Sequence, residues 1–264
     1  MRLYAIPIVK NRWAYYCHST IPSISRLTKA VDWSSQKWDA LGQAKADSWK
    51  KKLHDRGTNV MNQLDYQEWF FKSVPGKSEM EQALDKVIIH HPSVLKGEVL
   101  DSELKDLLKK RVPYHKKYMY YSAYWVPVTC TFVIVPLVPN IPLAYNLFRL
   151  YSHYKAYKGA EHLQSLSDGG QLQFTPNEAI DGVLTNICFA VEQDIKFPNA
   201  IEQAFQQSPN KPDLLSLQQD IPGVLTESHI KQLVERLQVP GLEMELNRAR
   251  FQILKDIATQ RFRN

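Results

Sequence analysis

The stretch YMYYSAYWVPVTCTFVIVPLVPNIPLAYNLF, residues Tyr118–Phe148, is the strongest structural signal in the chain. It is 31 residues long and contains no Asp, Glu, Lys, Arg or His. A helix needs about 20 mostly apolar residues to cross the hydrocarbon core of a bilayer, so a run of this length indicates a membrane segment. Four prolines interrupt the run, at positions 127, 136, 139 and 142. Proline lacks the N–H group that continues a helix, so the pattern predicts a bent hairpin of two arms.

The two arms differ in length and composition. The first, Tyr118–Val135, has 18 residues, which is roughly 27 Å of helix and close to the thickness of the hydrocarbon core. Its first half is rich in tyrosine and tryptophan, which prefer the level of the lipid headgroups. The second arm, Ile141–Leu150, has ten residues, or about 15 Å. Because this arm covers only half a bilayer, we expect a short or re-entrant hairpin.

Basic residues flank the hairpin on both outer sides. Lys109–Arg111 and Lys116–Lys117 precede it, and Arg149, Lys155 and Lys158 follow the second arm. Positive flanks stay on the side of insertion, so we expect both ends of the hairpin on one side. Two alternatives remain open, a buried hairpin in a soluble core and two full spans in which an arginine snorkels. The residues expected at the membrane interface are Lys116, Lys117, Tyr118, Tyr121, Trp125, Arg149 and Lys155.

The rest of the chain is expected to be mainly helical. Apolar spacing predicts helices at residues 23–56, 58–71, 78–89 and 103–111, and again at 226–237 and 242–262. Residues 175–178 have the form of a capping box, and residues 167–173 are expected to form a loop. The predicted fold class is therefore mainly α, with helical parts around a Pro-broken hydrophobic hairpin. The predicted regions are 1–112, a mostly helical N-terminal part; 113–158, a membrane-associated hairpin; and 159–264, a helical C-terminal part.

The N-terminus supports two interpretations. The first 31 residues contain five Lys or Arg residues and no acidic residue, which is typical of mitochondrial targeting. The segments LYAIPIV and WAYYC are rich in strand formers, and KNR between them can turn. The same segment therefore also fits a small β-hairpin of the mature protein. Both interpretations hold if a targeting sequence is not cleaved.

Charge and motifs limit the kinds of function. A net charge of +6 and a pI of about 9.0 favour anionic partners. With a membrane segment present, we expect anionic lipid and no nucleic acid. The chain has no phosphate loop, dinucleotide fingerprint, nucleophile elbow or metalloprotease motif, and its three cysteines lack metal-site spacing. His90-His91 fits a helix end, and Asp65 with Glu68 fits an ordinary surface pair. We therefore expect no enzyme, and no catalytic, cofactor-binding or metal-binding residue.

Three stretches together resemble one protein family. They are MRLYAIPI with RWAYYC at the start, DYQEWFFKSVP ending at Pro75, and the hairpin region from Tyr114 to Leu163. They are similar to the mitochondrial potassium–proton exchange-related family over roughly residues 1–165. The resemblance implies a mitochondrial inner-membrane location, a role in potassium–proton exchange and membership of a larger assembly. It supplies no catalytic motif, so no site residue follows from it.

The uncharged run limits the role of this chain in exchange. A proton-coupled exchanger normally needs an ionisable residue at membrane depth, and Tyr118–Phe148 contains none. One hairpin also cannot enclose a pore, and the inverted repeats of many transporters are missing from the sequence. We therefore expect an inner-membrane subunit or regulator with soluble parts in the matrix. The alternative is an interaction or assembly protein on the matrix face, with no transport role, that binds anionic lipid such as cardiolipin.

Overall fold

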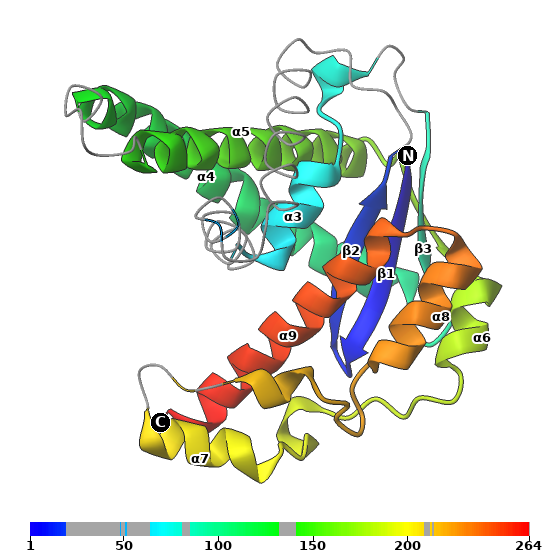
Figure 1. Ribbon diagram of the computed structural model, residues 1–264. Helices are drawn as coiled ribbons and strands as arrows, with labels where there is room; N and C mark the ends of the chain where they lie inside the picture. The colour runs from blue at the N-terminus through cyan, green and yellow to red at the C-terminus, as the bar shows by residue number, and fades with distance from the viewer. Residues whose placement is uncertain are drawn as a thin grey trace. The chain divides into compact units, whose positions relative to one another are not determined.

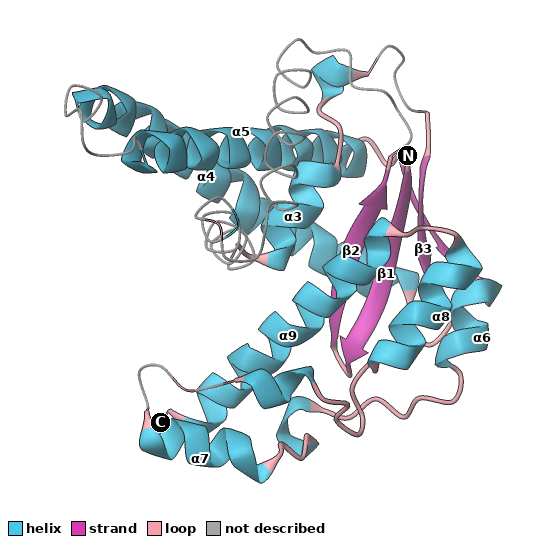
Figure 2. Ribbon diagram, viewed as in Figure 1, coloured by secondary structure: helices cyan, strands magenta, loops and turns pink. Residues whose placement is uncertain are grey.

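The computed structural model describes residues 1–19, 48, 51, 64–80, 85–131, 141–208, 212 and 214–263. The chain forms two compact units, each assembled from separate stretches of sequence. The first unit contains residues 1–18, 86–109 and 166–264, and the second contains residues 19–85 and 110–165. Helices predominate and the strands form one small sheet (Figures 1 and 2). The predicted fold class is confirmed, whereas the division at residues 112 and 158 concerns membrane association and stays a prediction.

The first unit begins with the expected β-hairpin. Strands β1 (Arg2–Val9) and β2 (Arg12–His18) pair antiparallel, with Leu3 opposite Cys17 and Ile6 opposite Ala14. The turn between them places Asn11 at a φ of 67°, a left-handed conformation that asparagine adopts more readily than most residues. All of β1 after Arg2 is buried, because this strand has a neighbour on each side.

Two further strands complete the sheet, and the sequence analysis missed both. Strands β3 (Val87–His91) and β4 (Leu172–Pro176) add in the order β2-β1-β3-β4, with β1, β3 and β4 parallel. The helix expected at 78–89 is wrong at its end, where β-branched residues join the sheet. Within residues 77–80 the chain forms only the short helix η1 (Lys77–Glu79). His90 and His91 end a strand and not a helix, and part of the expected loop at 167–173 is β4.

Helices cover the sheet of the first unit. The C-terminal helix α9 (Gly241–Phe262) contacts β1 and β2, α8 (Glu227–Leu237) contacts α9, and α6 (Glu178–Leu184) contacts α8 (Figure 1). The start predicted for α8 is confirmed, since the Thr226 side chain caps it by accepting from the His229 N–H. This unit also contains α7 (Asn199–Gln207), η3 (Glu192–Asp194) and η4 (Leu215–Gln218).

The start predicted for α6 is two residues too early. The N-cap of this helix is Asn177, whose side chain accepts from the backbone N–H groups of Ala179 and Ile180. Thr175, the first residue of the expected capping box, instead pairs with His90 in the sheet. Sheet pairing therefore overrides the local capping signal at this position.

Two long helices form the predicted hairpin. Helix α4 (Gly97–Cys130) and helix α5 (Ile141–Asp168) run antiparallel within the second unit, which holds α4 from residue 110 and α5 up to residue 165. There the Asn146 side chain donates to the Ser122 carbonyl over 3.1 Å. Both helices are longer than expected, because α4 continues through Pro113 and α5 extends 18 residues beyond Leu150. Among the described residues, no helix combines the length and the apolar character needed to cross a bilayer.

Helix α4 tolerates its two internal prolines because the chain on either side of them is held in place. An internal proline costs roughly 3 kcal/mol, since it removes a hydrogen bond and its ring clashes with the preceding turn. Leu108 and His115 on either side of Pro113 are buried, and this packing offsets the loss. Near Pro127, the Thr129 hydroxyl lies within hydrogen-bond distance of the carbonyls of Trp125 and Val126.

Helix α3 (Tyr66–Ser73) docks on α5 in the second unit. The sequence predicted a helix over 58–71, of which residues 64–71 are described. The helix expected at 23–56 lies outside the described residues, apart from residues 48 and 51. The backbone of α3 approaches α5 closely at Gly159, where an added Cβ would collide with the Phe71 carbonyl oxygen. Beyond α3, the ring Nδ1 of His162 lies 2.7 Å from the Pro75 carbonyl. Lys155 forms an ion pair with Glu79 over 2.7 Å.

We predict that Gly159→Ala destabilises the second unit by about 1–3 kcal/mol, the range for overpacking in a close contact. The added methyl group would meet backbone atoms of α3, which cannot rotate away as a side chain can. Urea unfolding followed by circular dichroism measures the effect. Ser165→Ala, at an exposed position of the same helix, is the control and should change the free energy of unfolding by less than about 0.5 kcal/mol. Equal effects of the two variants would contradict the close docking.

Candidate functional site

The second unit contains a buried cluster of polar side chains that come from three helices. We call it the stem cluster; its members are Glu68 from α3, His115 from α4, and Arg149, Ser152 and His153 from α5. The three members on α5 have the spacing i, i+3 and i+4, which places them on one face of the helix. The antiparallel pairing of α4 and α5 brings His115 opposite His153.

Glu68 is the acid of the cluster and is only 3% exposed. Its carboxylate accepts a hydrogen bond from the Ser152 hydroxyl over 2.6 Å and from Arg149 over 3.0 and 3.4 Å. Burial raises the pKa of Glu68, but the Ser152 hydrogen bond and the Arg149 charge outweigh it, so the net pKa is lowered. The carboxylate is therefore ionised at neutral pH. The expectation that Asp65 and Glu68 form a surface pair is wrong, since Asp65 instead caps α3 and pairs with Arg111 over 2.5 Å.

The donors of Arg149 fix the protonation of the two histidines. A guanidinium can only donate, so the Nη2 group of Arg149 donates to Nε2 of His153 over 2.8 Å. His153 must then carry its proton on Nδ1, which faces Nδ1 of His115 at 3.2 Å. His115 accepts this bond, so its own proton lies on Nε2. Among the described residues, that buried Nε2 has no hydrogen-bond partner.

Both imidazoles are consequently poor bases. The pKa of His115 is lowered to about 4, chiefly by burial, and the attraction of Glu68 only partly compensates. The pKa of His153 is also lowered to about 4, by burial and then by the positive charge of Arg149. Aromatic rings surround the pair: Tyr118 stacks on His153 with ring centroids 5.5 Å apart, and Tyr114 meets His115 edge-on at 5.2 Å. At neutral pH the cluster holds one ion pair and two neutral imidazoles.

The cluster has the donor types of a metal site but also contains its own cation. One ligand-type atom from each of Glu68, His115 and His153 lies within 4.8 Å of the others. Arg149, however, already donates to two of these three side chains. A guanidinium stays charged over the accessible pH range, so it would repel a divalent ion at this place. We therefore interpret the cluster as an imidazole and ion-pair network in which Arg149 is the resident cation.

The predicted membrane-interface residues fall into two groups. Five of them are exposed on α4, namely Lys116, Lys117, Tyr118, Tyr121 and Trp125. The other two form ion pairs within the second unit, since Arg149 binds Glu68 and Lys155 binds Glu79. The structure thus assigns Arg149 a partner that sequence reasoning missed. The i, i+3, i+4 spacing of Arg149, Ser152 and His153 was the signal available for finding this cluster.

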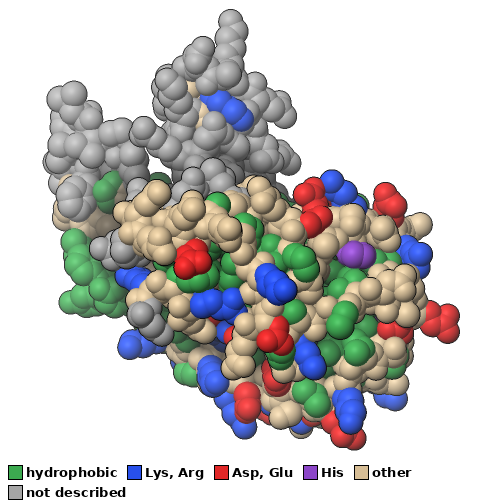
Figure 3. All heavy atoms as spheres, turned by 90° about the horizontal axis from the view of Figure 1, so that it is seen from below, with side chains coloured by type: hydrophobic (Ala, Val, Ile, Leu, Met, Phe, Trp, Pro, Cys, Tyr) green, Lys and Arg blue, Asp and Glu red, His purple; other side chains and the backbone are tan. Residues whose placement is uncertain are grey.

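The hairpin also exposes an apolar surface. Tyr120 is 61% and Tyr124 76% exposed on α4, and Tyr145 and Leu147 are exposed on α5. Figure 3 shows hydrophobic side chains gathered at the left edge of the view, where described residues of the hairpin lie. Elsewhere on the face that Figure 3 shows, acidic and basic side chains of the described residues are interspersed, without a single-sign patch. An exposed aromatic surface of this kind fits contact with another apolar or interfacial phase.

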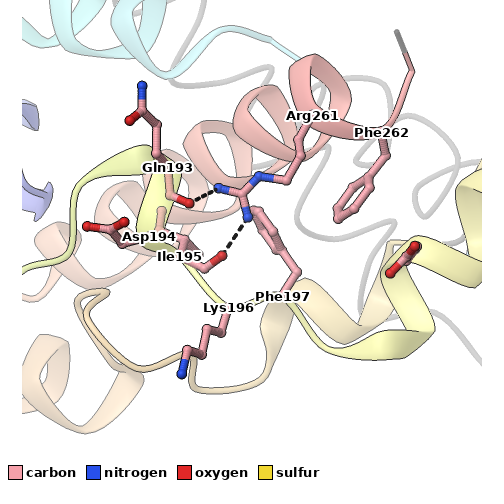
Figure 4. Close-up of a pocket in the computed structure, with 8 residues that line it drawn as sticks. Gln193, Asp194, Ile195, Lys196, Phe197, Arg261 and Phe262 are labelled. Carbon is pink, nitrogen blue, oxygen red and sulfur yellow. Dashed lines mark hydrogen bonds between the residues drawn. The ribbon is translucent and has the colours of Figure 1, made fainter.

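The first unit contains a hollow whose polar contacts stabilise the fold. It measures about 700 Å³ and is bordered by the turn after η3 and by the end of α9 (Figure 4). Arg261 crosses it and donates to the carbonyls of Ile195 over 2.6 Å and Gln193 over 2.9 Å. Its guanidinium also lies over the Phe197 ring, 5.2 Å from the centroid. Arg261 thus fastens the turn to α9, and the stem cluster remains the stronger candidate site.

We predict that Arg149→Met lowers the free energy of unfolding by about 3–5 kcal/mol, because it leaves a buried carboxylate without its cation. Urea unfolding at neutral pH measures the loss. Adding Glu68→Gln to Arg149→Met should recover part of it, since the unpaired charge is then gone. Lys158→Met is the control: it breaks an exposed pair with Glu161 and should cost less than about 1 kcal/mol. Similar losses for Arg149→Met and Lys158→Met would contradict a buried ion pair.

Comparisons with known proteins agree with the resemblance seen in the sequence. An uncharacterized protein of Schizosaccharomyces pombe is 25% identical over 189 residues, covering 70% of this chain and 83% of the relative. An uncharacterized protein of Saccharomyces cerevisiae is 26% identical over 205 residues, covering 65% of this chain and 64% of the relative, less than two thirds of its length. No solved structure matches the chain.

The family model described as mitochondrial K⁺–H⁺ exchange-related matches residues 2–167. This match includes the N-terminal strands, the hairpin and every member of the stem cluster. It spans more than half of the 264 residues. The chain therefore belongs to the mitochondrial K⁺–H⁺ exchange-related family.

Proposed function

We propose that this chain is a subunit or regulator of potassium–proton exchange, bound to the matrix face of the mitochondrial inner membrane through its α4–α5 hairpin. The observation that carries the proposal is the family match over residues 2–167, which relates the chain to mitochondrial K⁺–H⁺ exchange. The proposal includes a larger protein complex as partner and assigns no enzymatic chemistry to the chain.

The position of the ionisable residues supports a subunit over a complete exchanger. The uncharged run Tyr118–Phe148 offers no side chain that could carry a proton at membrane depth. The titratable members of the stem cluster lie outside this run, with His115 before it and Arg149 and His153 after it. They are paired with each other and with Glu68. In the proposal, the cation pathway is supplied by another chain.

The hairpin surface supports contact with anionic lipid. Tyr120, Tyr121, Tyr124 and Trp125 are exposed, and tyrosine and tryptophan favour the headgroup region. Lys116 and Lys117, which precede these aromatic residues on the same helix, are exposed as well. A lysine near an anionic membrane surface contributes about 1 kcal/mol to binding. Aromatic and basic side chains thus lie together where the proposal places the headgroups.

We predict that the purified chain floats with vesicles containing cardiolipin. Replacing Tyr120, Tyr124 and Trp125 by Ser should reduce binding because the apolar contact is lost. Lys116→Glu with Lys117→Glu should weaken binding at least about 10-fold and reduce its salt dependence. Lys10→Glu with Lys255→Glu makes the same charge change at exposed positions outside helices α4 and α5 and is the control. Equal loss in both lysine pairs would indicate a general charge effect and would contradict a hairpin interface.

The exchange role needs a separate test. Acute loss of the chain should slow the swelling of isolated mitochondria in potassium acetate, and re-expression should restore it. Robust potassium-dependent proton flux by the purified chain alone in liposomes would contradict the subunit proposal. Normal swelling together with intact cardiolipin binding would favour the second candidate, a matrix-face lipid-binding assembly protein, for which the exposed aromatic and basic residues of α4 are the supporting observation.

A further inference from the structure

We propose that His115 and His153 form a proton-responsive lock, which keeps α3 docked on the α4–α5 stem only while both imidazoles are neutral. The stem is defined here as residues 110–122 of α4 and 146–165 of α5. The regulatory use of the lock, acid-induced release of α3 during potassium–proton exchange, rests on the proposed function. The lock itself rests on the geometry of the stem cluster alone.

The hydrogen bonds leave no place for an additional proton. The ring Nε2 of His153 accepts from Arg149 over 2.8 Å, so a proton there would set two donors and two positive charges against each other. The ring Nδ1 of His115 accepts from Nδ1 of His153 over 3.2 Å, so a proton there would place two N–H groups face to face. Protonation of either ring therefore breaks one of these two contacts.

The surrounding charges also oppose a positive imidazole. Among the described residues, Lys72 from α3, Arg111 from α4 and Arg149 from α5 face the pair, and the carboxylate that faces it is Glu68. Arg111 is itself paired with Asp65. The phenols of Tyr114 and Tyr118 border the rings without adding charge near neutral pH. Within the described part of the second unit, the cationic side chains that face the two rings outnumber the carboxylates, so the closed cluster is a poor acceptor of protons.

Breaking the cluster would release α3 because α3 depends on it. The helix is eight residues long, which is too short to be stable in isolation. Its only buried acid, Glu68, is held by the same Arg149 that contacts His153. When His153 becomes charged, Arg149 is repelled and Glu68 loses its cation. The close contact between the backbone of α3 and Gly159 then has to hold α3 without the Glu68–Arg149 ion pair.

The direction of the pH effect follows from the pKa of each histidine in the docked and in the released state of α3. The pKa of each histidine is about 4 when α3 is docked and about 6.5 when the ring is exposed. The released state therefore binds more protons between these values, and docking becomes weaker as pH falls through this window. Glu68 stays ionised throughout, because its pKa is lowered. From about pH 7.5 to about pH 5.5, two such histidines raise the ratio of released to docked α3 about 100-fold, and one histidine raises it about 10-fold.

Hydrogen–deuterium exchange of the purified full chain tests the lock directly. Peptides covering Tyr66–Ser73 are followed at several pH values, with exchange corrected for the intrinsic pH dependence of amide exchange. The expected result is an increase of about 100-fold in α3 opening over this pH range, with no comparable change in α8. His115→Asn keeps an acceptor toward His153 and cannot take up the proton, so the increase should fall to about 10-fold. His18→Gln, at the end of β2 in the first unit, is the control and should leave the increase unchanged.

Two results would overturn the lock. One is an unchanged pH response of α3 in the double variant His115→Asn, His153→Gln. The other, which needs no variant, is a histidine NMR titration in which both rings protonate near 6.5 while α3 stays docked. Pairing the exchange experiment with the swelling assay separates the two proposals. Normal α3 release in a chain whose loss leaves swelling unchanged supports the lock and overturns the exchange role. Defective swelling with a pH-independent α3 supports the exchange role and overturns the lock.

Discussion

The ionised carboxylate of Glu68 is the constraint on which the second unit depends. A charge in a nearly water-free site must be paired and hydrogen-bonded, and Arg149 and Ser152 on α5 meet this need. Because Arg149 also reaches His153, satisfying the carboxylate determines which ring nitrogens carry protons. One buried acid thereby links α3 to both arms of the hairpin. The contact is polar, so it holds the helices in one register while contributing less to stability than apolar packing of the same volume would.

Steric fit and charge act together at this contact. Gly159 lets the backbone of α3 approach α5 to a distance that any other residue would prevent, and the Lys155–Glu79 pair lies just beyond the end of α3. The exposed aromatic residues of the hairpin, among them Tyr120 and Tyr124, lie within the uncharged run Tyr118–Phe148. The hairpin thus has charged, paired residues at its base and exposed aromatic residues farther along, and the proposed lipid contact rests on this division.

Local signals in the sequence predicted some elements well. The Thr226 cap, the α8 and α9 helices, the N-terminal β-hairpin and the hydrophobic hairpin follow from nearest-neighbour patterns, and the structure confirms them. Strands β3 and β4 were missed because their pairing is parallel and joins segments 85 positions apart, from Val87 to Leu172. The stop expected at Pro113 was wrong because packing on both sides of the proline outweighs its cost. The stem cluster was missed because Glu68 lies 81 positions from Arg149, and a single sequence carries no sign of that proximity.

The order of the strands has a consequence for how the protein is made. Strand β4 joins β3 only after Leu172 has left the ribosome, and by then the whole uncharged run Tyr118–Phe148 has already been synthesised. Until that moment β3 has an unpaired edge, which is open to incorrect pairing with other chains. Contacts between distant segments also form slowly. Translation therefore delivers the uncharged, apolar segment before the sheet is complete, so the hairpin and the edge of β3 are both without their final neighbours until residues 172–176 have been made.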